Sequence, residues 1–219
     1  MIKTSSIVEI AGLLVQGRPV VIPTDTVYGL ALAMSEGANT GILFDIKNRP
    51  VEKSIPLLVA SPDDLGRYGR EVPEWAWELA ERYWPGALTL VCEAGEAVPV
   101  AFRAADGSVA LRMPNHDLVL QLIAMLGCPL ATTSANISGQ PAVARLIDLD
   151  ERVVEQVAGV LADPGEASEA VEAGEAGGAG GAGGAEAVPS TIVSCLGEKP
   201  EVLRQGALDL SAVLADIGE

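Results

Sequence analysis

The stretch PLATTSANISGQP, residues 129–141, decides the class of fold that this sequence predicts. Its first half reads as a short buried strand, and its second half is rich in residues that form turns. Thr132, Ser134 and Asn136 occupy alternate positions there. Small polar side chains and free backbone amides at the end of a buried strand are a good lining for an anion or a nucleotide. Local capping of the turn is the other interpretation, since these residue types favour turns anyway.

The same order of a buried strand and a polar loop occurs earlier in the chain. PVVIP, residues 19–23, predicts a buried strand, and TDTVYGL, residues 24–30, predicts the loop that follows it. If the loop stays extended, alternation points the hydroxyls of Thr24 and Thr26 the same way. Both residues could instead close a local turn.

The remaining elements alternate between strand and helix. A first helix is capped by Ser5 or Ser6 and ended by Gly17. Further strands are predicted at residues 55–60, 87–94, 108–113, 190–196 and 201–206, and further helices at residues 38–47, 73–83 and 117–127. Residues 149–163 read as a helix followed by a strand, and a short helix closes the chain. Because no clean strand–helix–strand repeat appears, the pattern predicts one α/β domain, residues 1–219, with a mixed, twisted sheet.

One segment departs from this composition. Residues 165–187, GEASEAVEAGEAGGAGGAGGAEA, are almost entirely Gly, Ala and Glu. Such a tract cannot bury enough apolar surface to offset its ordering entropy. We expect it to be a flexible acidic insertion between two strands rather than a functional repeat.

Charge and composition exclude several classes of protein. The formal net charge is -16, and an acidic protein is poorly suited to coat nucleic acid or an anionic membrane. Cys92, Cys128 and Cys195 are far apart and His116 is the single histidine, which argues against a structural zinc site and against a disulfide framework. The first residues lack a signal-peptide pattern, and no apolar run approaches the ~20 residues that span a bilayer. We therefore expect a cytoplasmic protein.

Positive charge nevertheless gathers at one place. The stretch FDIKNRPVEKS, residues 44–54, contains Lys47, Arg49 and Lys53. Lys47 could simply complement a helix dipole, and the other two could be solvated. A planar arginine fork beside lysine point charges also suits a polyphosphate.

Two further arginines follow predicted strands. Arg112 ends SVALR, residues 108–112, where it could clamp a carboxylate bidentately or pair with a surface acid. Ser108 lies four residues earlier, so alternation places both side chains on one face. Arg204, in VLRQG, has the same two interpretations as Arg112.

Taken together, these segments resemble the TsaC/YrdC family of threonylcarbamoyl-AMP synthases. PTDTVYGLA, KNRP, YWPGALTLV, VALRMP, TTSANISGQP, STIV and VLRQG occur in the order and spacing of that family, from about residue 5 to residue 210. The K-x-R pair, Lys47 and Arg49, and the S-x-N pair, Ser134 and Asn136, are the most specific elements.

The resemblance implies a twisted α/β sheet with a concave cavity, and an enzyme that makes threonylcarbamoyl-adenylate from L-threonine, bicarbonate or CO₂, and ATP. A partner complex would then transfer the threonylcarbamoyl group to the tRNA adenosine next to the anticodon. The implied catalytic pair is Lys47 and Arg49. Mg²⁺ is expected to accompany ATP, and no protein side chain is assigned as a ligand of the metal. The implied ATP-binding residues are Arg49, Lys53, Ser108, Ser134, Asn136 and Arg204. The implied threonine-binding residues are Thr26, Arg112, Thr132 and Ser190, with Thr24 a weaker candidate.

A competing reading is a paralogue of the same fold that binds a nucleotide or double-stranded RNA without synthase activity. The K-x-R and S-x-N pairs favour the synthase. The net charge of -16 makes direct RNA binding doubtful.

Overall fold

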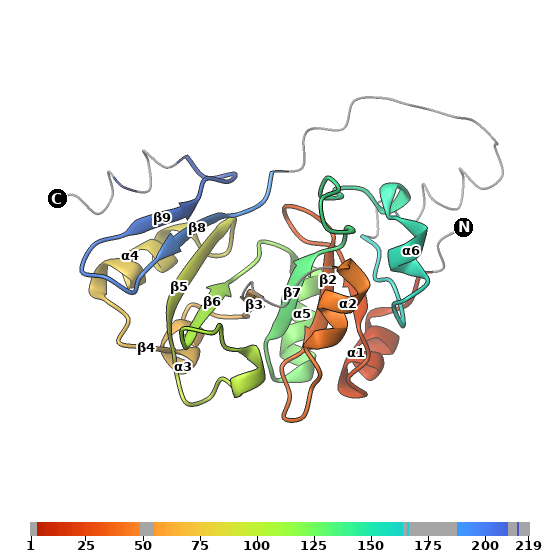
Figure 1. Cartoon of the computed structure of the whole chain (residues 1–219), viewed down its shortest axis with the longest axis horizontal. Helices are drawn as coiled ribbons and strands as arrows, with labels where there is room; N and C mark the ends of the chain where they lie inside the picture. Colours follow the sequence, from red (N-terminus) through yellow and green to blue (C-terminus); the bar gives the residue numbers. More distant parts are fainter. Residues whose placement is uncertain (1–3, 49–54, 164–165, 167–187, 210–213, 215–219) are drawn as a thin grey trace.

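The computed structural model describes residues 4–48, 55–163, 166, 188–209 and 214. Within these ranges, strands from both ends of the chain join one mixed sheet in the order β1-β2-β7-β3-β6-β5-β8-β9, with β4 paired to β5 (Figure 1). β3 is parallel to β6 and β5 is parallel to β8, while β1–β2, β2–β7 and β5–β6 are antiparallel. The predicted α/β fold with a mixed sheet is confirmed. The strands are β1 (Val20–Ile22), β2 (Gly29–Ala33), β3 (Leu57–Leu58), β4 (Gly69–Arg70), β5 (Leu88–Ala94), β6 (Ser108–Arg112), β7 (Leu130–Ser134), β8 (Thr191–Ser194) and β9 (Glu201–Arg204).

Most strands and helices begin and end near their predicted positions. The helices are α1 (Ile7–Val15), α2 (Gly41–Lys47), α3 (Asp64–Tyr68), α4 (Glu74–Tyr83), α5 (Asp117–Leu126) and α6 (Glu151–Val154). Ser6 begins α1 with a capping box, in which its side chain accepts from Glu9 N and the Glu9 carboxylate accepts from Ser6 N. The predicted strand after α6 is reduced to a single bridge between Val160 and Val21.

The sequence pattern missed the short elements α3 and β4, and also strand β2. TDTVYGL was expected to be a loop, but β2 begins at Gly29, inside that stretch, and continues to Ala33. All its residues are buried. Leu30 and Leu32 pack into one apolar core and Ala31 and Ala33 into the other, while β1 and β7 pair with its two edges. A Gly- and Ala-rich run has low strand propensity and no polar alternation, so only its place inside the sheet makes it a strand.

One face of the sheet is fully covered. Leu57, Leu111 and Leu90 stand in register on β3, β6 and β5, and all are fully buried. They belong to one apolar core with side chains of α2, α3 and α4. This core gives the cavity described below a rigid floor.

The other face is covered only in part. Helices α1 and α5 pack in a second core with Val20, Ala31 and Leu130 of β1, β2 and β7. In Figure 1 these helices lie beside β2 and β7, whereas β8 and β9 form the opposite end of the sheet. On the same face, β5, β6 and β8 present small or polar side chains such as Thr89 and Ala110. These offer little apolar surface for a helix to bury, and the space above them is a cavity.

Two predictions fall outside the described residues. They are the flexibility of the acidic insertion at 165–187, of which only Glu166 is described, and the closing C-terminal helix.

Candidate active site

A cavity of about 990 Å³ lies on the partly uncovered face of the sheet, and we call it the central cavity. Small-molecule sites are typically clefts of roughly 300–1,000 Å³, so this one has room for a nucleotide beside a second small ligand. Its lining alternates along three strands, with Thr89 and Val91 of β5, Ser108, Ala110 and Arg112 of β6, and Ile192 and Ser194 of β8. The end of β7 adds Thr132, Thr133 and Ser134. The prediction that Ser108 and Arg112 share one face is therefore confirmed.

Lys47 lies at one border of the central cavity. It is the last residue of α2 and is 3% exposed. Its Nζ donates to Asn136 O at 2.7 Å, to Asn136 Oδ1 at 3.1 Å and to Ser134 Oγ at 3.3 Å, and also to the backbone oxygen of Ser134. The lysine thus joins the end of α2 to the loop that follows β7.

Asn136 has a double role in that loop. Its Nδ2 donates to Gln140 O at 2.7 Å and to Ile137 O at 3.1 Å, while its Oδ1 accepts from Lys47. Ser138 N donates to Lys47 O at 2.9 Å, so the contact between loop and helix runs in both directions. The turn-capping interpretation holds for Asn136, and it places the side chain against the cavity rather than away from it.

Arg112 lies at the end of β6 and is 6% exposed. Its Nε donates to Gly86 O at 3.0 Å, its Nη1 to Thr26 Oγ1 at 3.0 Å and its Nη2 to Asp25 Oδ1 at 2.7 Å. Burial lowers the pKa of Arg112, and the charge of Asp25 acts in the opposite direction. A buried cation is costly unless it is paired and hydrogen-bonded, and this one is both.

Thr24 holds the loop that carries Asp25. Its Oγ1 accepts from Thr26 N and Val27 N, both at 3.2 Å, and donates to Val27 O at 2.6 Å. This is the local turn that the sequence left open as an alternative. Thr24 borders the cavity, but its hydroxyl hydrogen is used within its own loop. Thr26, by contrast, accepts from Arg112.

Arg204 reaches the central cavity from β9, at the edge of the sheet. Its Nη2 donates to Ser190 O at 2.8 Å and to Ser190 Oγ at 3.2 Å, and its Nε donates to Ser190 O at 3.1 Å. Ser190 Oγ also lies 2.8 Å from Thr89 Oγ1. The pKa of Arg204 is lowered by burial and by the like charge of Arg112. Two arginines, one from β6 and one from β9, therefore line the same cavity.

Ser108 lies at the start of β6. Its Oγ donates to Asp106 Oδ1 at 2.7 Å, and its backbone N donates to the same oxygen at 2.9 Å. The hydrogen bond from the Ser108 hydroxyl is the main reason why the pKa of Asp106 is lowered. Because its one hydrogen is already donated, Ser108 Oγ can only accept from a ligand. This end of the cavity therefore suits a ligand group that donates hydrogen bonds.

The predicted site residues come together in space. Those that the structure describes all line the central cavity: Thr24, Thr26, Lys47, Ser108, Arg112, Thr132, Ser134, Asn136, Ser190 and Arg204. Thr132 uses its hydroxyl to donate to Leu130 O at 3.1 Å. Arg49 and Lys53 lie outside the described residues.

Sequence reasoning assigned no role to Thr89, Asp106 or Asp25, which contact site residues in the structure. Thr89 and Asp106 carry no local signal, because one lies inside an apolar strand and the other in an ordinary turn. Asp25 did have a signal: it stands between two threonines in the loop after β1.

Other chemistry finds little support in the described part of the chain. Burial raises the pKa of the Cys92 thiol and of the Cys195 thiol to about 12, so neither is a nucleophile near neutral pH. Among the described residues, no group of three or more His, Cys, Asp and Glu could hold a metal ion. No helix in the same ranges is long and apolar enough to cross a membrane.

Comparisons with known proteins identify the family of the chain. The family model Sua5_yciO_yrdC, described as "Telomere recombination", matches residues 12–173. A threonylcarbamoyl-AMP synthase from Pyrococcus abyssi is 36% identical over 210 residues, which cover 95% of this chain and 56% of that protein. A threonylcarbamoyl-AMP synthase from Pseudoalteromonas translucida is 31% identical over 166 residues, covering 75% of this chain and 89% of its own length.

A solved structure contains the architecture of this chain. The crystal structure of P. abyssi Sua5 complexed with L-threonine has a TM-score of 0.82 and 32% identity, over 97% of this chain and 57% of that one. The chain thus spans just over half the length of the P. abyssi protein. On the family model and these relatives, the chain belongs to the Sua5/YciO/YrdC family.

Proposed function

We propose that this chain synthesises L-threonylcarbamoyl-adenylate from L-threonine, bicarbonate or CO₂, and ATP, and releases pyrophosphate. The observation that carries the proposal is a single cavity in which Lys47, Arg112 and Arg204 meet hydroxyls from several strand ends. That lining suits an anionic nucleotide beside a small polar acid. Relatives named threonylcarbamoyl-AMP synthase support the assignment.

ATP occupies the part of the cavity between Lys47 and Ser108. Lys47 contributes its positive charge to the phosphate site, because its N–H groups already face oxygens of Ser134 and Asn136. Arg49 and Lys53 of the same stretch contact the phosphates, and Arg204 closes on them from β9. Ser134 and Asn136 position the nucleotide beside Lys47, to which both already bind. The nucleoside end lies near Ser108 and Asp106, because ribose hydroxyls and the adenine amine can donate to acceptors that a phosphate cannot use.

L-Threonine occupies the part of the cavity beside Arg112. The guanidinium of Arg112 takes the substrate carboxylate, since a planar donor fork matches a planar acceptor. Thr26, Thr132 and Ser190 line the same region. Thr24 contributes through the turn that it holds rather than through a direct contact.

The reaction needs no protein nucleophile. The neutral amine of threonine adds to CO₂ and loses a proton, which gives a carbamate. A carbamate oxygen then attacks the α-phosphorus of ATP in line, and the bond to pyrophosphate breaks. The protein contributes by holding the reactants close together and by neutralising developing charge on the phosphates, the part assigned to Lys47 and Arg49.

Mg²⁺ enters as the partner of ATP. The described residues offer no cluster of carboxylates for a resident metal. We therefore assign the ion to the phosphate oxygens, where it shields negative charge as in other phosphoryl transfers.

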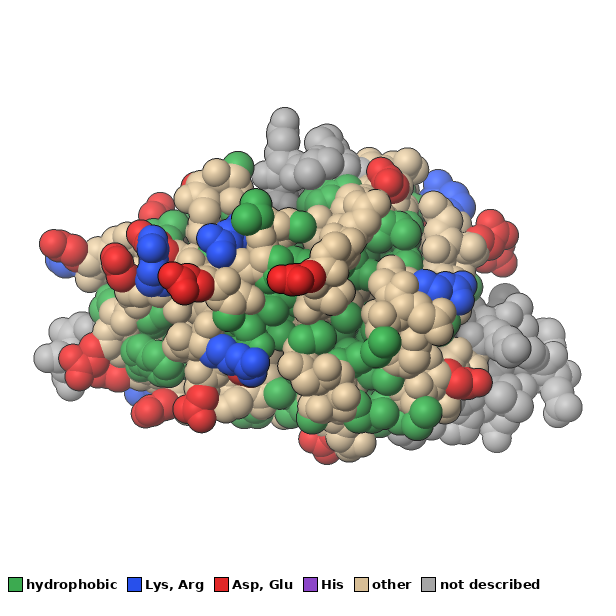
Figure 2. All heavy atoms as spheres, turned by 90° about the horizontal axis from the view of Figure 1, so that it is seen from below, with side chains coloured by type: hydrophobic (Ala, Val, Ile, Leu, Met, Phe, Trp, Pro, Cys, Tyr) green, Lys and Arg blue, Asp and Glu red, His purple; other side chains and the backbone are tan. Residues whose placement is uncertain are grey.

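The product would be consumed by a separate tRNA-modifying complex in the cytoplasm, which transfers the threonylcarbamoyl group to N6 of the adenosine next to the anticodon. Direct RNA binding by this chain is not part of the proposal. On the face shown in Figure 2, Lys and Arg side chains stand singly among Asp and Glu rather than in a continuous basic patch. Nucleic-acid binding surfaces need such a patch.

The decisive experiment is incubation of the chain with ATP, L-threonine and bicarbonate. We expect pyrophosphate release that depends on all three, together with a product of the mass of threonylcarbamoyl-adenylate. ATP binding without threonine-dependent pyrophosphate release would instead indicate a nucleotide-binding paralogue without synthase activity.

A further inference from the structure

Arg112 is held by contacts from separate parts of the chain. The acceptor of its Nε is the carbonyl oxygen of Gly86, a residue just before β5. The other two acceptors, Thr26 and Asp25, belong to the loop between β1 and β2. These contacts use one N–H on each nitrogen of the guanidinium. A guanidinium has five N–H donors, so the described residues leave one N–H on each terminal nitrogen for a ligand.

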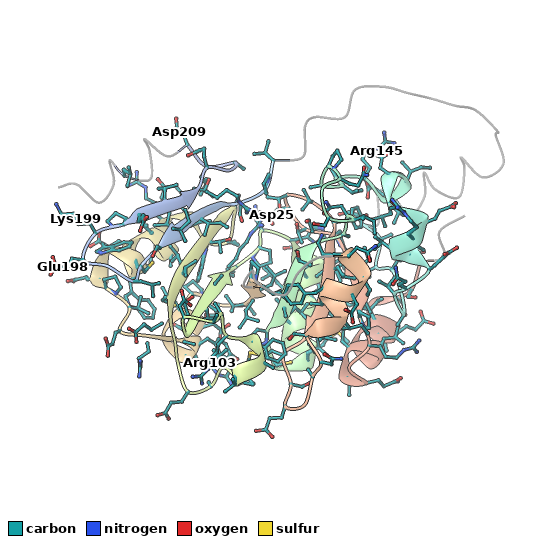
Figure 3. All side chains as sticks on the ribbon, viewed as in Figure 1. Asp25, Arg103, Arg145, Glu198, Lys199 and Asp209 are labelled. Carbon is teal, nitrogen blue, oxygen red and sulfur yellow. The ribbon has the colours of Figure 1, made fainter. Side chains whose placement is uncertain are left out.

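Asp25 is the charged member of this set. Its Oδ1 lies 2.7 Å from Arg112 Nη2, and the two side chains are 14% and 8% exposed, respectively. Figure 3 shows Asp25 near the middle of the molecule, in the region between β6 and β7. Thr24 and Thr26, on either side of it, line the central cavity. Asp25 is exposed as a whole residue, but its side chain and that of Arg112 are largely withdrawn from solvent, and Arg112 lines the cavity.

The loop that carries Asp25 is itself fixed. Thr24 Oγ1 binds the backbone of Thr26 and Val27, and Tyr28 N donates to Val143 O at 2.7 Å. A carboxylate on a fixed loop can hold a guanidinium in one orientation, whereas a lone arginine would sample several rotamers.

We propose that Asp25 is a positioning residue for the amino-acid site: it orients Arg112 so that its two free N–H groups face the substrate carboxylate. The inference rests on the proposed function, because it assigns that carboxylate to Arg112. Asp25 acts through Arg112 and does not itself touch the substrate.

The test compares ligand binding by the full chain and its Asp25 variants. In Asp25→Asn and Asp25→Ala we expect L-threonine affinity to fall about tenfold, the usual scale for losing one charge-assisted contact, while ATP affinity changes less than about twofold. Asp25→Glu should recover part of the loss. Asp63→Asn removes the same charge from an exposed position at the start of α3, with no side-chain capping bond, and should change neither affinity.

Two threonine analogues separate positioning from direct contact. (R)-3-Hydroxybutanoate keeps the carboxylate and lacks the amine, whereas L-threoninamide keeps the amine and lacks the carboxylate. Positioning predicts that Asp25→Asn weakens threonine and 3-hydroxybutanoate by the same factor and leaves threoninamide unchanged. A loss confined to threonine and threoninamide would overturn the proposal, because it would mean that Asp25 binds the substrate amine.

A double-mutant cycle gives a second readout if an analogue binds too weakly. Once Arg112→Ala is in place, adding Asp25→Asn should weaken threonine binding no further, since the residue acts only through Arg112. Losses of threonine affinity that add in the double variant, or full threonine affinity in Asp25→Asn, would contradict the inference. A thermal melt of each variant confirms that it is folded, and wild-type protein that binds neither ATP nor threonine would instead refute the proposed function.

Discussion

The two arginines of the central cavity are held in different ways. Arg112 is 6% exposed, ends an interior strand and pairs with a carboxylate on another loop. Arg204 belongs to the edge strand β9 and donates to the neutral oxygens of Ser190. Within the described residues it forms no ion pair with Asp or Glu. Arg112 is therefore tied into the fold as well as facing the cavity, whereas Arg204 is tied to the fold only through Ser190.

Arg112→Ala should have the largest effect of the variants that test this difference between the two arginines. It leaves the Asp25 carboxylate in a largely buried position without its cation, and breaking a buried pair typically costs about 3–5 kcal/mol. We expect a clear fall in the free energy of unfolding, measured by denaturant titration, together with loss of threonine binding. A fall of less than about 1 kcal/mol would place Arg112 among ordinary surface ion pairs.

Gly206→Ala should disturb the backbone that anchors Arg204, while both arginines stay unchanged in sequence. A Cβ atom there would lie 2.3 Å from Pro189 O and 2.3 Å from the carbonyl carbon of Ser190. The Ser190 backbone, which anchors Arg204, would have to move, and we expect a loss of about 1–3 kcal/mol, as for other overpacking changes. Gly197→Ala is the matched control, because its nearest neighbour, Lys199 O, is 3.7 Å away. Equal melting temperatures for the two variants would contradict this account.

Arg112→Lys sharpens the comparison by keeping the charge and removing the planar fork. Lysine can still pair with Asp25, so stability should fall by only about 1 kcal/mol. Threonine affinity should fall about tenfold, because a point charge cannot bind a carboxylate bidentately. Titration of threonine at saturating ATP measures the effect, and superimposable curves for variant and wild type would remove Arg112 from the site.

Arg204→Ala should have the smallest effect on the fold. Its partners are neutral and β9 is an edge strand, so we expect the free energy of unfolding to change by less than about 0.5 kcal/mol. ATP affinity, by contrast, should fall about tenfold, with a weaker dependence on salt. Denaturant titration measures the free energy of unfolding, and calorimetry at two ionic strengths measures the ATP affinity and its dependence on salt. A large stability loss with unchanged ATP affinity would reverse the roles assigned to the two arginines.

Particular residues show how far sequence reasoning reached. Strong patterns predicted α1, α5 and β5 close to their observed positions, because caps and long apolar runs are local signals. Strand β2 was not predicted, because GLALA shows no alternation of apolar and polar residues. It is a strand because it pairs with β1 and β7. Asp25 lies between two predicted site residues, Thr24 and Thr26. Its role was not predicted, because its partner Arg112 is 87 positions away in the chain.

The sequence by itself determined the α/β class, the polar loops after buried strands and the residue types at the site, since these depend on periodicity and composition. It also determined that Ser108 and Arg112 share a face, because a strand alternates with period two. Only the tertiary structure decided which groups are already occupied. Thr24 is bound within its turn, Ser108 donates to Asp106, and Arg112 is paired with Asp25. Whether a polar group is free for a ligand depends on what stands within about 3 Å of it, and long-range packing fixes those neighbours.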